Sequence, residues 1–177
     1  MAAAGICHSD LSVINGSRPR VMPMVLGHEA SGIVREVGRG VANLKEDDHV
    51  VFSYVPVCGR CLPCSTGRAS LCEPGAKANI DGTLLTGKRH FHSRDGRELH
   101  HHQGVSAYSQ FTVAAWRSLV RIDPSLPLDK AALFGCAVMT GVGAVVNTAR
   151  VDPGTAVGVF GMGGVGLSAV MGAKTAG

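Results

Sequence analysis

Four cysteines lie within a short central stretch of the chain, at Cys58, Cys61, Cys64 and Cys72, in the pattern C-x2-C-x2-C-x7-C. Such close spacing lets consecutive thiolates converge on one tetrahedral ion, with Zn–S distances of ~2.3 Å. Gly59 and Pro63 allow the backbone to turn between them. We therefore expect residues 56–75 to fold as a lobe around a structural Zn²⁺. Because four thiolates fill the coordination shell, this site should stabilise the fold rather than catalyse.

An iron–sulfur cluster and a set of unrelated buried thiols are the alternatives. Bacterial ferredoxins use C-x2-C-x2-C-x3-C-P, whereas here the last gap is seven residues and Glu73 precedes Pro74. Unrelated thiols are improbable at this density. Disulfides are disfavoured because the N-terminus, MAAAGICHSD, has neither the basic nor the long apolar region of a secretory signal. We expect a cytoplasmic location, where clustered cysteines bind metal or do chemistry.

Charge and hydropathy exclude several classes of protein. The balance of 17 Lys and Arg over 13 Asp and Glu is only +4 and contains no basic run, which argues against a nucleic-acid partner. Residues 156–173 are uncharged for 18 positions, the lower limit for a membrane-spanning helix. Glycine fills a third of that stretch, however, so a buried strand, a glycine turn and a packed helix explain it better. We expect no membrane association.

The order of apolar patterns predicts a mixed α/β chain. We expect a helix at 8–14, one or two helices within 128–150 and another after the glycine turn, with strands at 31–38, 48–55, 107–114, 118–122 and 155–160. The segment 76–104 is polar, with Asp-Gly pairs, and predicts hairpins or surface loops. The chain then divides into a β-rich domain over 1–137 and the start of a second domain over 138–177.

The histidines of the segment 90–102 allow two interpretations. His90, His92, His100, His101 and His102 could form a metal-binding tract, but the polar composition favours a solvated loop. We also expect His49 to lie on the surface at the start of a strand.

A glycine-rich turn follows the last predicted strand. Gly161-Met162-Gly163-Gly164-Val165-Gly166 matches G-x-G-x-x-G between a strand and a helix, a context that favours a dinucleotide-binding turn over a plain β–α turn. In such a turn Gly161 permits the tight bend, Gly163 lets the backbone approach the pyrophosphate and Gly166 lets the helix pack. The acidic residue that selects NAD over NADP would lie ~20 residues further on, beyond residue 177.

A second, open metal site is a candidate. Cys7, His28 and Cys136 would supply the three nitrogen and sulfur ligands that a catalytic zinc needs, with a fourth position free. Their separation, by 20 and 107 residues, is weak evidence alone. On composition, His28 could equally be a satisfied polar residue beside Glu29, and Cys136 a core thiol.

Five motifs in a fixed order favour the metal-site interpretation of Cys7, His28 and Cys136. GICHSD, GHEASGIVREVG, the four-cysteine lobe, GCAVMTG and GMGGVG follow one another as in the zinc-dependent medium-chain alcohol dehydrogenases, which the sequence resembles over nearly all of its length. Residues 76–104 match loosely. The resemblance implies a GroES-like β-rich catalytic domain with a zinc lobe, followed by a truncated Rossmann domain. By comparison of motif order, the first ~40 residues and the second half of the family lie outside this chain, so we expect it to be a fragment or a truncated product.

The resemblance also implies roles for single residues. Cys7, His28 and Cys136 match the catalytic zinc ligands, and the four lobe cysteines match the structural site. Asp10 matches the carboxylate that orients the histidine ligand, Glu29 the acidic residue behind the zinc, and Ser9 the hydroxyl that relays the alcohol proton. The remaining matches are His8 at the cofactor pyrophosphate, Thr140 near the nicotinamide, Gly161, Gly163, Gly164 and Gly166 in the cofactor turn, and Tyr54 in the substrate-pocket wall. Ser12 stands where some members carry a histidine that ends the proton relay.

The activity so implied is hydride transfer between an alcohol and its aldehyde or ketone, with two Zn²⁺ per chain and NAD, or else NADP, as cofactor. The partner is a small-molecule alcohol or aldehyde, and the full-length form is expected to be a homo-oligomer. The alternative is a truncated, non-catalytic module stabilised by zinc. The Cys7, His28 and Cys136 set discriminates between them, because a purely structural module needs only the lobe.

Overall fold

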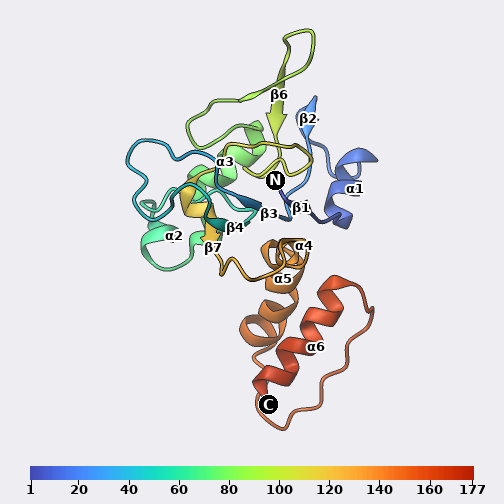
Figure 1. Cartoon of the computed structure of the whole chain (residues 1–177). Coiled ribbons are helices and arrows are strands. Elements are labelled where there is room, and N and C mark those ends of the chain that lie inside the picture. The colour runs from blue at the N-terminus through green and yellow to red at the C-terminus, as the bar shows by residue number, and fades with distance from the viewer.

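Seven short strands in the first 121 residues form two sheets, and a group of helices follows them (Figure 1). The computed structural model describes residues 1–177. The strands are β1 (Ala3–Ala4), β2 (Met24–Val25), β3 (Ala30–Ile33), β4 (His49–Phe52), β5 (Phe91–His92), β6 (Glu98–His101) and β7 (Leu119–Arg121).

The larger sheet has the strand order β1-β3-β4-β7, and every neighbouring pair is antiparallel. Ser31 lies opposite both Ala3 and Val51, which fixes the register. In the smaller sheet β6 pairs in parallel with β2 and antiparallel with β5. Successive side chains of a strand point to opposite faces, so Ala30 of β3 and Val50 and Phe52 of β4 join one small core. The buried members of this core are Ala30, Val34, Leu44, Val50, Phe52, Val105 and Ala107.

The predicted strands are longer than the observed ones. The strand expected over 31–38 ends at Ile33, and the one expected over 48–55 covers only His49–Phe52. The prediction of a strand at 107–114 is wrong. Only Ala107 and Tyr108 donate backbone hydrogen bonds across to Gly27 and Leu26. Further along, residues 110–114 line a cavity of about 900 Å³ together with Ile33 and Val34, and no strand pairs with them.

The first helix is as predicted, α1 (His8–Ile14), and its start is capped by a side chain of the helix itself. Asp10, at the third helical position, accepts the backbone N–H of Cys7 at 3.2 Å. The cysteine segment also forms helices, α2 (Leu62–Ser65), the 3₁₀ turn η1 (Ala69–Leu71) and α3 (Glu73–Asp81). Most of α3 falls in the segment 76–104, where hairpins or surface loops were expected, so that expectation is wrong for residues 76–81. The signals of α3 are Pro74 in the first turn and Gly82 in the left-handed conformation just after the end.

The histidine segment is not a solvated loop. Residues 91–101 form the β5–β6 hairpin around Asp95-Gly96. A hairpin was one of the two structures expected within 76–104. His101 and His102, however, are only 0% and 2% exposed, because parallel pairing of β6 with β2 draws the end of the hairpin into the interior. The backbone N–H of His90 donates to His101 Nε2 at 3.2 Å. His49 is half-buried at the start of β4, not fully on the surface.

The chain from residue 128 onward is helical, as predicted, but broken into pieces. The 3₁₀ turn η2 (Trp116–Ser118) precedes β7; the pieces that follow are α4 (Leu128–Ala131), η3 (Ala132–Gly135), α5 (Ala137–Gly143), the π-helical turn η4 (Ala144–Ala149) and α6 (Gly164–Ala176). Helices α5 and α6 pack side by side (Figure 1). The domain boundary predicted at residue 138 falls within α5 and stays a prediction.

The strand predicted at 155–160 is absent, although the helix after it is present. Residues 155–160 run as an irregular segment along the outside of the helices, where no other strand of this chain lies beside them. The apolar stretch 156–173 is therefore part coil and part α6. By length and composition no single helix could span a membrane; Leu128–Gly135 and Ala137–Ala149, bent by 49°, meet those two criteria only when taken together.

Buried His101 should make the fold acid-sensitive. Burial, with the nearby charges of His90 and Arg89, lowers the pKa of His101 to about 4, against 6.5 in the unfolded chain. Between these values the unfolded chain binds more protons, so stability falls as pH drops through this window. We expect His101→Phe to take up about one proton fewer on unfolding near pH 5, seen as a shallower fall of the unfolding midpoint with pH. His92→Phe, on the exposed part of the hairpin, is the control, and an equal change in both variants would contradict the interpretation.

Candidate functional site

The four lobe cysteines converge on one point. Their sulfurs lie within 4.8 Å of one another, and the Cys58–Cys64 and Cys61–Cys72 sulfur pairs are 4.0 and 3.9 Å apart. Four sulfurs ~2.3 Å from one central ion lie about 3.8 Å from each other in a regular tetrahedron. These separations are far too long for disulfides. They fit a single ion rather than a cluster, whose multi-atom inorganic core would hold the sulfurs further apart.

Backbone amides surround the lobe sulfurs. Cys58 Sγ accepts from the N–H groups of Arg60 and Cys61, and Cys72 Sγ accepts from those of Cys58 and Gly75, at 3.3–3.5 Å. The Arg60 amide is the main reason that the pKa of Cys58 falls to about 6. Burial, and then hydrogen bonds with the neighbouring thiols, raise the pKa of Cys64 to about 12. A bound cation favours the thiolate form of its cysteine ligands, so the donor set fits a divalent ion such as Zn²⁺.

A second ligand set lies where α1, the start of β3 and the start of α5 meet. Cys7 precedes α1, His28 precedes β3 and Cys136 precedes α5, and their two sulfurs and one ring nitrogen lie within 4.8 Å of one another. Residues separated by 20 and 107 positions in the chain are thus brought together by the fold. Three ligands of nitrogen and sulfur type that leave one direction open fit the donor set of a catalytic zinc.

Asp10 lies directly behind His28. Its Oδ1 is 3.2 Å from His28 Nδ1, which leaves His28 Nε2 facing the two cysteines. Burial alone would lower the pKa of His28, but the Asp10 carboxylate and Cys136 raise it to about 10 in the metal-free chain. Burial alone would raise the pKa of Cys7, whereas Ser9 and His28 lower it. Both shifts favour the charged forms of His28 and Cys7 in this pocket.

Two further predicted residues lie beside His28. Ser9 Oγ is 3.4 Å from His28 Nε2, on the side of the ring that faces the ligand set. The Tyr54 ring meets the His28 ring edge-on, with centroids 5.9 Å apart. His8 and Thr140 are exposed, on α1 and α5, and make no side-chain hydrogen bond.

Glu29 connects the two ligand-bearing segments. It is buried next to His28, and its Oε1 accepts the backbone N–H of Ala137 at 2.8 Å, directly after Cys136. A side chain at Gly5 would collide with the Glu29 carboxylate. Glu29 thereby ties the first turn of α5 to the strand that follows His28.

The glycine turn before α6 lies next to the start of α5, which carries the ligand Cys136 at its N-terminus. A Cβ at Gly164 would lie 3.1 Å from the Ala137 Cβ, so the start of α6 adjoins the residue after Cys136. Gly161 has φ +93°, and a Cβ at Gly166 would lie 1.8 Å from the Gly161 carbonyl oxygen, so both positions require glycine. Gly163 has open space around it. This geometry leaves room for a phosphate at the N-terminus of α6.

Comparison with known proteins identifies the family of the chain. Residues 1–124 match the alcohol dehydrogenase GroES-like domain family. The chain belongs to the zinc-dependent alcohol dehydrogenase family. The predictions of that family and of a mixed α/β fold with a GroES-like domain are confirmed.

Solved structures of alcohol dehydrogenases resemble the chain over 97–99% of its length. An alcohol dehydrogenase zinc-binding domain protein from Burkholderia ambifaria is 35% identical, with a TM-score of 0.92 and 48% of its own chain covered. Benzyl alcohol dehydrogenase from Acinetobacter calcoaceticus is 32% identical, with a TM-score of 0.87 and 47% covered. CAD from Helicobacter pylori, complexed with NADP(H), is 30% identical, with a TM-score of 0.76 and 46% covered. The chain spans about half the length of these proteins.

Two residues that contact Asp10 in the candidate site are not predicted from the sequence. Tyr108 donates its hydroxyl to Asp10 Oδ2 at 3.2 Å, and His102 lies 3.4 Å from Asp10 Oδ1 with its ring edge-on to His28. His102 belonged to the histidine segment that was interpreted as a loop. No local pattern marks Tyr108, because its contact with Asp10 spans 98 residues.

Loss of one lobe cysteine should loosen the lobe and leave the rest folded. We expect Cys64→Ser to release one zinc and to increase proteolysis within residues 56–75 by about tenfold or more, because metal binding and local folding are coupled there. Limited proteolysis followed by mass spectrometry measures this. Ser65→Ala changes a neighbouring residue whose hydroxyl bonds only Leu62 within α2, and should behave as the parent does. Equal resistance of Cys64→Ser and the parent would show that the lobe does not depend on metal.

Proposed function

We propose that this chain forms the zinc-binding catalytic part of an oxidoreductase that interconverts an alcohol and its aldehyde or ketone with NAD(P). The observation that carries the proposal is the open ligand set of Cys7, His28 and Cys136 beside the hydroxyl of Ser9. A non-catalytic module would need only the closed lobe. The family membership of the chain supports the same reaction class.

The residues of the open site have separable tasks. A zinc ion held there would supply Lewis-acid chemistry, lowering the pKa of an alcohol as it does that of water. Asp10 fixes the tautomer and orientation of His28 by accepting its Nδ1–H, which leaves Nε2 free as a ligand. We propose that Ser9 Oγ, 3.4 Å from that nitrogen, accepts the proton that the alcohol loses while it gives up its own hydroxyl proton. The exposed Ser12 hydroxyl donates to the backbone of His8 and not to Ser9, so we propose that the proton leaves Ser9 directly to solvent.

The cofactor would bind along the start of α6. Backbone N–H groups after Gly163 are free to meet the pyrophosphate, and the contact of Gly164 with Ala137 places this turn beside the open site. His8 on α1 and Thr140 on α5, both exposed, are proposed to contact the pyrophosphate and the region of the nicotinamide. A nicotinamide cofactor would accept the hydride, while the protein supplies orientation and charge. We propose NAD, and the NADP(H) complex of the Helicobacter pylori protein keeps NADP as the alternative.

The substrate is proposed to be a small alcohol or aldehyde that contacts Tyr54. The Tyr54 ring stands edge-on to His28 at one side of the open site. An aromatic wall suits a flat, apolar substrate. The resemblance to a benzyl alcohol dehydrogenase supports that preference.

Metal content tests the two-site assignment. Purified chain should contain about two zinc ions, and Cys136→Ser about one, because a catalytic site that loses one of three protein ligands binds zinc weakly. Atomic absorption or mass spectrometry of the native protein measures this. Met139→Ser alters an exposed side chain on the same helix and should keep both ions. Retention of both ions by Cys136→Ser would show that the open site is assigned wrongly.

Turnover should require a complete cofactor domain. A doubly wound domain binds its dinucleotide between two halves, and this chain contains one glycine turn and one following helix. Without the remainder, the reacting carbon cannot be held at the ~3–3.5 Å that hydride transfer needs. We expect no NAD reduction by the 177-residue chain with primary or aromatic alcohols, and measurable reduction by a chain extended with a complete cofactor domain.

The matched control is Cys136→Ser in the extended chain, which should be inactive. Zinc-dependent turnover by the 177-residue chain alone would contradict this prediction. It would mean that a second copy completes the cofactor site.

A further inference from the structure

Asp10 is 1% exposed, and its carboxylate accepts four hydrogen bonds. Oδ1 accepts from the Gly27 amide at 3.3 Å and from His28 Nδ1 at 3.2 Å. Oδ2 accepts from the Cys7 amide and from the Tyr108 hydroxyl, both at 3.2 Å. Three of these donors belong to the two ligand segments themselves. Tyr108 is the only one that comes from a distant part of the chain.

A carboxylate offers about four lone-pair positions, so these donors saturate Asp10. His102 shows the consequence. Its Nδ1 lies 3.4 Å from Asp10 Oδ1, yet it forms no hydrogen bond, and the ring is 2% exposed. Three N–H groups therefore crowd Oδ1, whereas Oδ2 is held only by the Cys7 amide and the Tyr108 hydroxyl. The Tyr108 hydroxyl is one of the two contacts on Oδ2, the oxygen that His102 does not approach.

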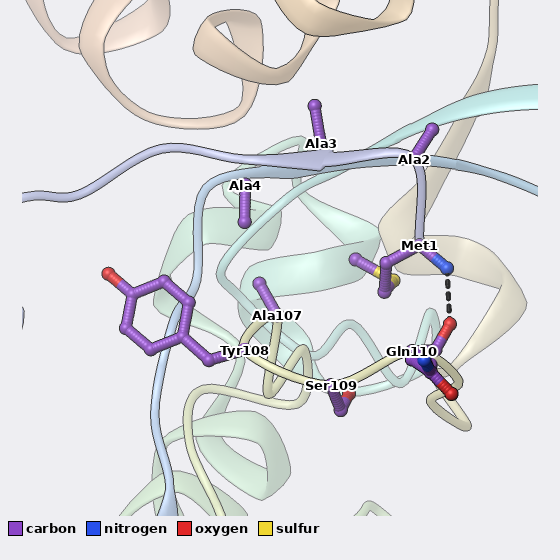
Figure 2. A pocket seen from close by; sticks show the side chains of 8 residues that line it. All are labelled: Met1, Ala2, Ala3, Ala4, Ala107, Tyr108, Ser109 and Gln110. Carbon is purple, nitrogen blue, oxygen red and sulfur yellow. Dashed lines mark hydrogen bonds between the residues drawn. The ribbon is translucent and has the colours of Figure 1, made fainter.

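Tyr108 is itself anchored to the backbone that leads to both ligands. Its backbone N–H donates to the carbonyl of Leu26, two residues before His28. Its single hydroxyl proton is shared between two acceptors at 3.2 Å, Asp10 Oδ2 and the carbonyl of Gly5, two residues before Cys7. Figure 2 shows the ring at one end of a pocket lined by residues 1–4 and 107–110, with the hydroxyl pointing away from the Met1–Gln110 hydrogen bond at the other end. Burial, and then the negative charge of Asp10, raise the pKa of Tyr108 to about 12, so the hydroxyl keeps its proton and remains a donor.

We propose that Tyr108 is a positioning residue for the metal ligand His28, acting through Asp10. The hydroxyl sets the rotation of the carboxylate, and the carboxylate sets the orientation of the His28 ring. Without the hydroxyl, Oδ2 loses one of its two donors and the carboxylate can rotate to satisfy His102. Oδ1 then moves off the axis of the His28 Nδ1–H bond. This inference rests on the proposed zinc site at Cys7, His28 and Cys136.

The chain offers a matched pair of variants, because Tyr54 and Tyr108 are its only tyrosines. Tyr108→Phe removes the hydroxyl that bonds Asp10 and keeps the ring. Tyr54→Phe removes a hydroxyl from a ring that also adjoins His28 but makes no hydrogen bond to Asp10. Zinc-loaded chains are challenged with a chromogenic chelator, and release is followed in time. Release of zinc from two sites should follow two kinetic phases. The phase that is absent from Cys136→Ser is assigned to the open site.

Partners of a metal-ligating histidine commonly change metal affinity by 10–100-fold, and Tyr108 acts one bond further away. We therefore expect Tyr108→Phe to release the open-site zinc about 3–10-fold faster, with release from the lobe unchanged, and Tyr54→Phe to match the parent in both phases. As a second measurement, ¹¹³Cd NMR of the cadmium-loaded chain should show a shifted resonance for the site with two thiolates in Tyr108→Phe only. The lobe resonance should stay in place.

Open-site release by Tyr108→Phe at the parental rate would overturn the proposal. Equal acceleration of both phases would also overturn it, since that is the result of a general loss of stability. If the parent itself shows no phase that Cys136→Ser removes, the zinc-site assignment fails first and the role of Tyr108 falls with it. The two failures are thereby distinguished.

Discussion

The buried carboxylate of Asp10 is the contact on which the candidate active site depends. As the third residue of α1 it accepts the amide of Cys7 and so helps to start the helix, while its other oxygen holds the ring of His28. One side chain therefore fixes the ends of two segments that are 20 residues apart, each of which ends in a proposed metal ligand. A buried carboxylate without donors would be costly. The fold supplies four donors, which satisfy the buried carboxylate.

Glu29 connects the segment that carries His28 to the helical part of the chain. Through the Ala137 amide it connects the strand after His28 with the start of α5, and Ala137 in turn adjoins Gly164 at the start of α6. A ligand set, a proposed proton acceptor and a proposed phosphate turn thus meet around one helix start. The lobe cysteines contribute to none of these contacts, which agrees with a purely stabilising task for their metal.

Local signals in the sequence predicted much of this arrangement. The cysteine spacing predicted the lobe, the pattern at 8–14 predicted α1, and the glycine turn was placed directly before its helix. What failed depended on pairing with distant segments. Residues 155–160 have the pattern of a strand but no partner strand in this chain, and residues 107–114 border a cavity instead of a sheet. His101 and His102 look polar in sequence and are buried by the parallel pairing of β6 with β2. The role of Tyr108 could not be predicted, because no local sequence pattern indicates a contact between residues 98 positions apart.

X-ray absorption at the zinc edge of the fully loaded chain tests the central claim most directly. The lobe would give its zinc four sulfur neighbours, and the open site would give two sulfurs, one nitrogen and one oxygen. The average expected is about three sulfurs at ~2.3 Å and about one nitrogen or oxygen at ~2.0–2.1 Å per zinc. A shell of four sulfurs with no light neighbour, at full loading, would show that Cys7, His28 and Cys136 do not bind zinc and would contradict the account.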